Sequence, residues 1–317
     1  MNDASFRAGF VAVAGRPNVG KSTLINALVG QKIAAVSPKP QTTRKRQLGI
    51  LTTERGQIVF VDTPGIHKPA HKLGQALNEE ARQALGDADV VLFVVDASRP
   101  PTPEDEMVAR HIRALDEPRP VIVALNKADL VSGDQRAAQE ALYAALVPDA
   151  ERVWISALTG ENLPALLNRL FAHLPPGPPF YDPDQVTDLY ERDIAADLIR
   201  EAALLHLRDE VPHSIAVRID EYKERESGAA YIAATLFVER DSQKGIVIGR
   251  KGAMLKQIGM TARKAIEAMS GRRVYLELRV KVRKNWRNDE AFLRQFGFAF
   301  GKGKGAKRGR GRGGAGG

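Results

Sequence analysis

Short apolar runs, separated by longer polar or periodic segments, recur through the first half of the chain. They occupy residues 10–14, 58–61, 90–95, 121–125 and 153–155. Runs of this length are typical of strands, and runs without polar alternation are typical of strands buried on both faces. The pattern therefore predicts a parallel sheet covered by helices on both sides.

The second half of the chain has a different pattern of apolar and polar residues. A proline-rich stretch at 174–179 cannot continue a helix or a central strand, so it predicts a domain boundary. Beyond it, apolar and polar residues alternate in three segments, which predict half-buried strands around 215–219, 232–238 and 274–282. Helical periodicity predicts amphipathic helices over 188–207 and 253–269.

A glycine-rich segment follows the first apolar run and matches the pattern G-x-x-x-x-G-K-[ST]. It lies between the predicted strand 10–14 and a predicted helix 23–29, the context of a P-loop rather than of an ordinary glycine-rich turn. The glycines let successive N–H groups and the helix N-terminus converge on a polyphosphate. We predict nucleotide contacts from Gly15, Arg16, Pro17, Asn18, Val19, Gly20, Lys21, Ser22 and Thr23.

Within this loop, Lys21 and Ser22 have distinct predicted roles. The Lys21 ammonium should reach the β- and γ-phosphates, and the Ser22 hydroxyl should ligate magnesium. A polar segment at 37–46 follows and is predicted to be a mobile loop, in which Thr43, with Thr42 as second choice, closes over the γ-phosphate and its magnesium. These residues predict a nucleoside di- or triphosphate with Mg²⁺ as cofactors. The base-selecting motifs described below make the predicted nucleotide GTP or GDP.

The next strand ends in the tetrapeptide Asp62-Thr63-Pro64-Gly65. A carboxylate at this position can hold the magnesium through water, and the Gly65 N–H can meet the γ-phosphate. We therefore predict metal ligation by Ser22, Thr43 and Asp62. We also predict nucleotide contacts from Asp62, Thr63, Pro64, Gly65 and Ile66.

Two later motifs predict the choice of base. In Asn126-Lys127-Ala128-Asp129, the Asp129 carboxylate can accept from the guanine N1–H and 2-amino groups together, a donor pair that adenine lacks. Asn126 should brace the site and Lys127 should cover the ring. A backbone N–H of Ser156-Ala157-Leu158 should reach the guanine carbonyl oxygen.

These five elements, in this order, resemble the translation-factor-like class of GTPases, which implies an α/β fold with a doubly wound sheet. In that class a glutamine that orients the attacking water often follows D-x-x-G, whereas this chain has Ile66. Unaided hydrolysis should therefore be slow. In related GTPases an asparagine at the position of Asn18 ligates potassium, so the resemblance implies K⁺ as a further candidate cofactor; alternatively, Asn18 is a loop residue that tolerates unusual dihedrals. The predicted catalytic set is Lys21, Thr43, Asp62, Gly65 and Asn18.

A second glycine motif lies between two predicted helices of the C-terminal half. Its residues are Ile248, Gly249, Arg250, Lys251 and Gly252. G-x-x-G in the order helix-strand-strand-helix-helix-strand resembles the bacterial type of KH domain, an α+β fold (type II). Such a loop approaches a nucleic-acid backbone closely and places its basic residues against the phosphates of about four unpaired nucleotides. The alternative is a plain basic turn.

Charge and composition narrow the partners. The net charge is +9, and segment 301–317 carries six lysines and arginines without an acid, which leaves +3 for the rest. This distribution predicts a polyanionic partner such as nucleic acid. No cysteine, no export signal and no apolar run of membrane-spanning length is present, so we expect a cytoplasmic protein with at most peripheral membrane contact.

A P-loop GTPase joined to a C-terminal KH domain resembles the Era family of bacterial ribosome-assembly GTPases. The likeness includes Q-T-T-R at 41–44, D-T-P-G-I-H at 62–67 and V-I-G-R-K-G at 247–252. It implies a GTP-binding domain at 1–176, a linker at 177–185, a KH domain at 186–300 and a disordered basic tail at 301–317. The Gly-Lys-Arg tail departs from the usual family ending.

The family resemblance further implies a GTPase, expected to be a monomer, that binds the small (30S) ribosomal subunit and the 3′ region of its 16S rRNA. It also implies that nucleotide state controls RNA affinity, and that the protein associates peripherally with the inner face of the cell membrane. Two other interpretations stay open. In one, the protein is an RNA chaperone in which GTP is a structural ligand; in the other, it is a membrane-surface GTPase, an interpretation that depends only on the basic tail.

Overall fold

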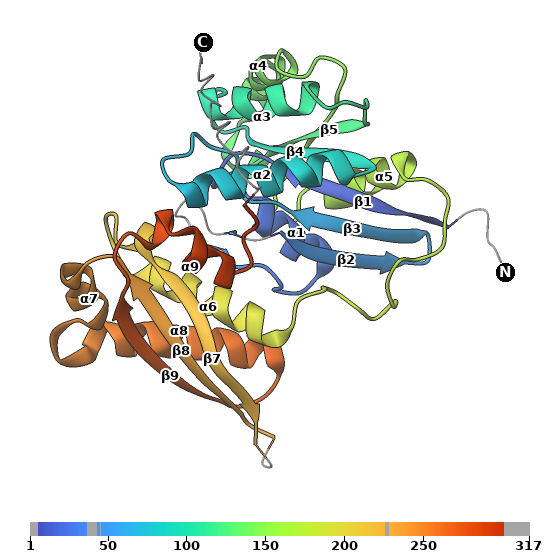
Figure 1. Ribbon diagram of the computed structural model, residues 1–317. Coiled ribbons are helices and arrows are strands. Elements are labelled where there is room, and N and C mark those ends of the chain that lie inside the picture. Colours follow the sequence, from blue (N-terminus) through green and yellow to red (C-terminus); the bar gives the residue numbers. More distant parts are fainter. Residues whose placement is uncertain (1–5, 37–42, 45, 226–227, 301–317) are drawn as a thin grey trace, which may run out of the picture.

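The computed structural model describes residues 6–36, 43–44, 46–225 and 228–300, which form two units, each built on its own sheet (Figure 1). Most of the predicted loop at 37–46 and the whole basic tail at 301–317 lie outside the described residues. Within the described ranges, no helix combines the length and the apolar character that crossing a membrane requires.

The first unit is a six-stranded sheet in the order β2-β3-β1-β4-β5-β6. All neighbouring strands are parallel except β2 and β3, which are antiparallel. Its strands are β1 (Arg7–Ala14), β2 (Gln47–Thr53), β3 (Gly56–Asp62), β4 (Val90–Asp96), β5 (Val121–Asn126) and β6 (Glu151–Trp154). Its helices are α1 (Lys21–Val29), α2 (Lys72–Asp87), α3 (Pro103–Arg113), α4 (Gly133–Ala144) and α5 (Leu163–His173).

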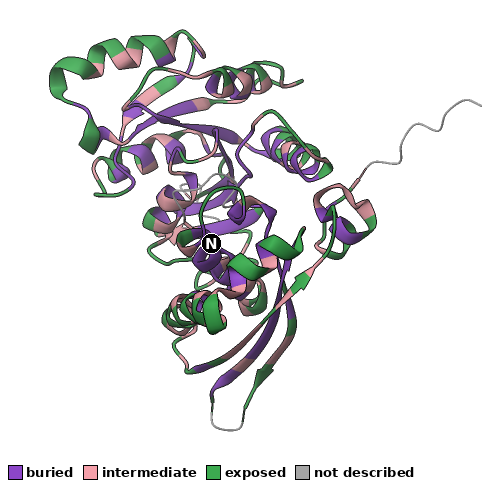
Figure 2. Ribbon diagram, turned by 90° about the vertical axis from the view of Figure 1, so that its left-hand side faces the viewer, coloured by how far each residue is buried: buried purple, intermediate pink, exposed green. Residues whose placement is uncertain are grey.

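Helices cover both faces of this sheet, as the uninterrupted apolar runs predict. Leu24 of α1 and Leu170 of α5 pack on one face. Leu85 of α2, Val108 of α3 and Tyr143 of α4 pack on the other. Figure 2 shows the buried positions concentrated in the strands and on the inward sides of the helices. The doubly wound α/β fold is therefore confirmed, and it brings the carboxyl ends of β1, β3, β4 and β5 to one edge.

Strand β2 was not predicted. It lies directly after the polar segment and pairs antiparallel with β3, from Gln47 opposite Asp62 to Thr53 opposite Gly56. Its apolar content is modest, and its pairing with a neighbour across a short turn stabilises it.

The second unit is a three-stranded sheet in the order β7-β8-β9, with β7 antiparallel and β9 parallel to β8. Its elements are α6 (Glu191–His206), β7 (Ala216–Glu224), β8 (Ala230–Val238), α7 (Asp241–Ile248), α8 (Ala253–Ser270), β9 (Val274–Val282) and α9 (Glu290–Gln295). The order helix-strand-strand-helix-helix-strand is as predicted. Helix α6 begins at Glu191 rather than at residue 188, and α9 was not predicted.

The two units touch through an apolar cluster. Leu73 and Leu77 of α2 are buried against Trp286, Phe292 and Leu293 of the C-terminal segment. Figure 1 shows α9 on the side of the second unit that faces α2. Because α2 directly follows the D-T-P-G segment, the second unit is packed against an element that starts near the nucleotide motifs.

Candidate nucleotide site and nucleic-acid groove

The P-loop is held by close backbone contacts that only glycine permits. Gly20 has φ +103°, and a Cβ there would lie 2.3 Å from Asn126 Nδ2. A Cβ at Gly15 would lie 2.4 Å from the carbonyl oxygen of Val94. Asn126 Nδ2 also donates to the Val19 carbonyl at 2.7 Å, so the loop is fixed against the ends of β4 and β5.

Lys21 is buried with its ammonium turned toward its own loop. Its Nζ donates to the carbonyls of Gly15 and Arg16, each at 3.0 Å. Burial lowers the pKa of Lys21 from 10.5 to about 8, against the opposing attraction of Asp62. A buried cation that makes only neutral contacts is well placed to gain from an anionic phosphate. The Arg16 side chain points elsewhere and pairs with Asp105 at 3.0 Å.

The three predicted magnesium ligands come together. Ser22 Oγ lies 2.9 Å from Thr43 Oγ1 and donates to Asp62 Oδ2 at 2.9 Å, and Thr43 Oγ1 donates to the same oxygen at 3.0 Å. Burial raises the pKa of Asp62, while Lys21 lowers it in part. Asp62 Oδ1 is buried and has no hydrogen-bond partner among the described residues.

This oxygen cluster fits a hard cation. Two hydroxyls and a carboxylate with one unused oxygen match the ligand preference of magnesium, which completes its shell with phosphate oxygens and water. Among the described residues no group of three or more histidine, aspartate or glutamate side chains offers an alternative metal site.

The D-T-P-G segment lies directly against the P-loop. A Cβ at Gly65 would lie 2.6 Å from the backbone nitrogen of Pro17, so the two segments meet at a distance that requires glycine. Thr63 Oγ1 donates to the Val13 carbonyl at 2.9 Å, which fastens the segment to β1. The Ile66 side chain is 1% exposed and packs in the core of the first unit, so it cannot position a water molecule.

Asn126 links the P-loop to the last motif. Its Oδ1 accepts from the Ala157 N–H at 2.9 Å while its Nδ2 holds Val19. Asp129 Oδ1 accepts from Ser156 Oγ at 2.5 Å, so both guanine motifs share one network. Lys127 has φ +69° and donates to Asp96 at 2.8 Å.

A small cleft joins the phosphate and magnesium residues. It is lined by Pro17, Asn18, Gly20, Lys21, Ser22, Thr23, Ala35, Val36, Thr43 and Gly65. Asn18 has φ +65°, a left-handed conformation that asparagine tolerates better than most residues. The backbone alone can therefore account for an asparagine here. Of the other predicted contacts, Pro64 is buried beside Gly65, whereas the Leu158 side chain is 80% exposed and could contribute only its backbone.

The second glycine motif forms the predicted tight loop. Gly249 has φ +72°, and a Cβ there would lie 2.7 Å from Met254 Cβ. Lys251 also has a positive φ of 51°. Helix α7 ends at Ile248, and Arg250 and Lys251 are exposed, so both cations face outward from a loop held between α7 and α8.

A groove of about 540 Å³ runs from this loop between α8 and β9. Its residues include Gly252, Leu255, Lys256, Gly259, Met260, Arg263, Tyr275 and Leu278. Met260 is 48% and Tyr275 55% exposed, and Arg225 stacks on Tyr275 at 4.6 Å from the ring centroid. Exposed apolar surface with basic residues along it suits bases and phosphates of a single strand. These groove residues were not predicted from the sequence, although the basic residues Lys256 and Arg263, which flank the apolar Met260 on one helix, were a usable signal.

Comparison with known proteins assigns both units. Residues 10–127 match the family model described as 50S ribosome-binding GTPase, and residues 210–287 match the KH domain. GTPase Era of Heliobacterium modesticaldum is 46% identical over 292 residues, covering 92% of this chain and 97% of the relative. GTPase Era of Carboxydothermus hydrogenoformans is 45% identical over 295 residues, covering 93% and 98%.

Two solved structures agree with this assignment. One is a crystal structure of Era in complex with MgGDPNP and nucleotides 1506–1542 of 16S ribosomal RNA, with TM-score 0.88 and 42% identity over 93% of this chain and all of that one. A crystal structure of an Aquifex aeolicus Era variant bound to GDP and AlF4⁻ gives the same TM-score, identity and coverage. Since relatives above 40% identity span nearly the whole chain, this protein belongs to the Era family of GTPases.

Proposed function

We propose that this GTPase binds single-stranded RNA at the 3′ region of 16S rRNA and acts in assembly of the 30S subunit, with GTP hydrolysis timing its release. The observation that carries the proposal is the groove between α8 and β9, where exposed apolar residues and basic side chains continue from the G-x-x-G loop. The Era structure that contains 16S nucleotides 1506–1542 and the identity over both units support it.

We propose one functional domain for each of the two sheets. Residues 1–176 form the GTP-binding domain, 177–185 the linker, 186–300 the KH domain and 301–317 a basic tail. The family matches at 10–127 and 210–287 each lie inside one proposed domain, which supports the assignment of one domain to each half of the chain.

The nucleotide chemistry assigns a role to each buried polar group. The Lys21 ammonium exchanges its carbonyl partners for the β- and γ-phosphates, and the Gly65 N–H donates to the γ-phosphate. Ser22, Thr43 and Asp62 would hold magnesium, with Asp62 acting through water. At that position the ion would supply positive charge to offset the negative charge that develops on the phosphates during hydrolysis. Asp129 and a backbone N–H of the 156–158 segment select guanine.

Hydrolysis needs a further group, since Ile66 is buried and apolar. We assign part of this role to potassium at Asn18, which lines the phosphate cleft, and the rest to bound RNA. Replacing potassium by sodium at constant ionic strength should lower the rate of hydrolysis. An unchanged rate would contradict the potassium assignment and leave RNA as the activator.

In this proposal, Arg250 and Lys251 of the G-x-x-G loop contact phosphates, while bases lie along Tyr275 and Met260 of the groove. Each phosphate contact to a single strand adds about 0.7 to the slope of log affinity against log salt. Losing both basic side chains of the loop should therefore lower that slope by about 1.4.

The test is binding and turnover of the full chain with an RNA of 16S nucleotides 1506–1542. We expect this RNA to raise GTP turnover, and the double change Arg250→Asp and Lys251→Asp to abolish both binding and stimulation. The control reverses the charge of two exposed arginines of α3, through Arg110→Asp and Arg113→Asp. It changes the net charge by the same amount, but in the other unit, away from the groove. Equal losses in both variants would mean that only net charge matters, and normal RNA binding by the loop variant would refute the assignment.

Membrane association is a separate prediction of the family resemblance. We propose that any such contact is peripheral and depends on the basic segment 301–317. The measurement is co-sedimentation of the full chain and of a chain ending at residue 300 with anionic vesicles, and equal sedimentation of the two would refute the role of the segment.

A further inference from the structure

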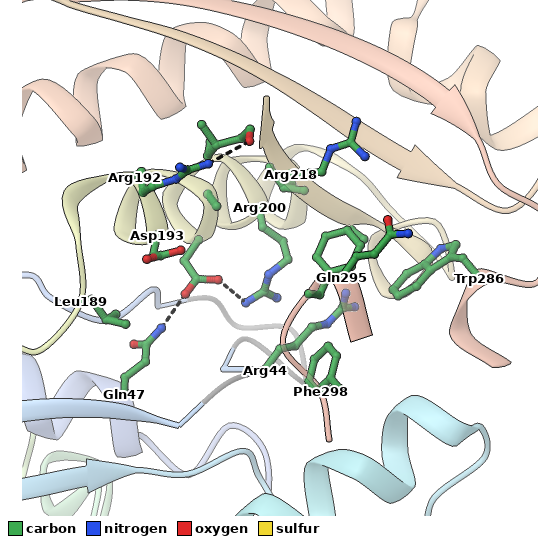
Figure 3. Close-up of a pocket in the computed structure, with 16 residues that line it drawn as sticks. Arg44, Gln47, Leu189, Arg192, Asp193, Arg200, Arg218, Trp286, Gln295 and Phe298 are labelled. Atoms are coloured by element: carbon green, nitrogen blue, oxygen red, sulfur yellow. Dashed lines mark hydrogen bonds and ion pairs between the residues drawn. The ribbon is translucent and has the colours of Figure 1, made fainter. Parts of the chain in front are cut away.

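A cavity separate from the nucleotide cleft lies between the two units (Figure 3). Its lining comes from Arg44 and Gln47, from α6 and β7, and from C-terminal residues between 286 and 298. Its volume of about 470 Å³ falls within the usual range for sites that bind small molecules. We call it the interdomain cavity.

The lining carries an excess of positive charge. Its arginines are Arg44, Arg192, Arg200 and Arg218, against the two carboxylates Asp193 and Asp197. Asp197 is already engaged, because it accepts from Gln47 Nε2 at 2.5 Å and from Arg200 at 3.3 Å. Arg218 is also paired, with Asp220 at 2.8 Å. Arg44 and Arg192 then face one further lining carboxylate, Asp193, so the lining keeps an excess of one positive charge.

Two buried polar atoms in the lining have no hydrogen-bond partner among the described residues. They are Arg44 Nε and Gln47 Oε1, in side chains of residues that are 8% and 4% exposed. The remaining nitrogens of Arg44 donate to the carbonyls of Ile215 at 2.6 Å and His213 at 3.1 Å, so its guanidinium is fixed in place. An unsatisfied buried donor or acceptor is costly. Within the described part of the chain, Arg44 Nε therefore lacks an acceptor, preferably an anionic one, and Gln47 Oε1 lacks a donor.

The remaining wall is apolar and aromatic. Trp286, Phe296, Phe298, Val217 and Ile219 line it, and the Arg44 guanidinium lies 5.5 Å from the Trp286 ring centroid. Figure 3 shows the Arg44 and Phe298 side chains close together at this wall. Such a surface suits a flat apolar body rather than a bare inorganic ion. The basic segment 301–317 has the wrong sign of charge to be the occupant.

We propose that the interdomain cavity binds a small organic anion. Its charged oxygen accepts from Arg44 Nε beside Arg200, a donor group meets Gln47 Oε1, and an apolar body lies along Phe296 and Leu189, which are half-buried in the lining. Because both units contribute to the lining, the ligand joins the segment after Thr43 to the second unit. The proposal does not depend on RNA binding.

The probe is 8-anilinonaphthalene-1-sulfonate, which combines a sulfonate, an anilino N–H and flat apolar rings. The full chain is first saturated with GDP and magnesium so that the phosphate cleft is occupied. We expect a saturable rise in fluorescence with one probe per chain. Arg200→Met removes the cation beside the proposed anion and should weaken binding at least about tenfold, because the attraction between opposite charges is lost in a partly buried site. N-phenyl-1-naphthylamine, which lacks the sulfonate, should bind more weakly and be insensitive to Arg200→Met.

A matched pair of tryptophan substitutions locates the probe. Ala196 of α6 is half-buried and lines the interdomain cavity, so Ala196→Trp should fill it and abolish binding without removing a charge. Met260→Trp places the same bulk in the groove of α8 and should leave probe binding unchanged. Absence of saturable binding, or binding that Met260→Trp abolishes and Ala196→Trp does not, would overturn the proposal, as would equal binding of the uncharged analogue.

Discussion

The depressed pKa of Lys21 predicts a pH dependence of nucleotide affinity that differs between nucleotides. Burial brings this pKa to about 8 in the nucleotide-free protein. The phosphates should raise it again by stabilising the charged form. Binding is therefore linked to proton uptake above pH 8, and we expect GDP affinity to fall as the pH rises through that value.

The magnitude follows from the titration of one group. For a pKa of about 8, the charged fraction falls from about nine tenths at pH 7 to about one tenth at pH 9. If Lys21 stays charged in the complex, GDP affinity falls about tenfold over this interval, which corresponds to about 1.4 kcal/mol. Below pH 7 this group should have almost no effect.

The assay is competitive titration of GDP and GMP against a fluorescent guanine nucleotide between pH 7 and pH 9, at constant ionic strength. GMP has the same base but no β-phosphate, so it shares the effects of base ionisation and of Asp129 without the contact to Lys21. We expect the ratio of GDP to GMP affinity to fall about tenfold. A constant ratio would refute the assignment of Lys21 to the β-phosphate.

The same pKa predicts the opposite trend for the stability of the nucleotide-free protein. Between pH 8 and 10.5 the unfolded chain binds a proton at Lys21 that the folded chain does not, so this group makes the free energy of unfolding rise with pH. From pH 7 to pH 9 the gain is about 1.4 kcal/mol. Urea unfolding of the wild type and of Lys21→Met between pH 7 and pH 9 measures this contribution to the free energy of unfolding, since the variant lacks the titrating group. Parallel stability curves for the two proteins would show that Lys21 keeps an ordinary pKa when folded.

Three further perturbations test the remaining assignments. Asp129→Asn should shift preference from GTP toward xanthosine triphosphate, because the amide donates where the carboxylate accepted, and unchanged selectivity in nucleotide competition would contradict the assignment. Gly65→Ala places a Cβ 2.6 Å from the Pro17 nitrogen and should weaken GTP binding more than GDP binding, since the Gly65 N–H serves the γ-phosphate; equal losses would remove that role. Deleting residues 301–317 should lower the salt slope of RNA binding by at most about 4 and keep sequence preference, and an unchanged slope would show that the segment does not contact RNA.

Much of the first unit could be predicted because its signals are local. Each apolar run is a strand, and each polar motif follows the strand that positions it, so spacing alone brings Lys21, Ser22 and Asp62 to one edge. Strand β2 escaped prediction because its stability comes from pairing with β3, a relation that its own pattern of residues does not express.

The groove between α8 and β9 and the interdomain cavity could not be predicted from local sequence patterns. Tyr275 and Met260 lie on different elements and become neighbours only when β9 lies beside α8. Ile66 shows the same dependence on the fold. Its apolar side chain could be expected from the sequence not to orient water. Its burial, at 1% exposed, depends on helices far along the chain that pack against it. Interactions between distant segments require the fold.

The contact between the units gives a physical route from nucleotide to RNA. Thr43 Oγ1 donates a hydrogen bond to Asp62. The next residue, Arg44, donates hydrogen bonds to the carbonyls of His213 and Ile215 just before β7. A second route runs through α2, whose Leu73 and Leu77 are buried against the C-terminal segment. Because Thr43 and Arg44 are adjacent in the chain, a movement of the Thr43 backbone on loss of the γ-phosphate would also displace Arg44 and disturb its contacts with the second unit. A ligand in the interdomain cavity would act on the same arginine, so it would oppose that displacement.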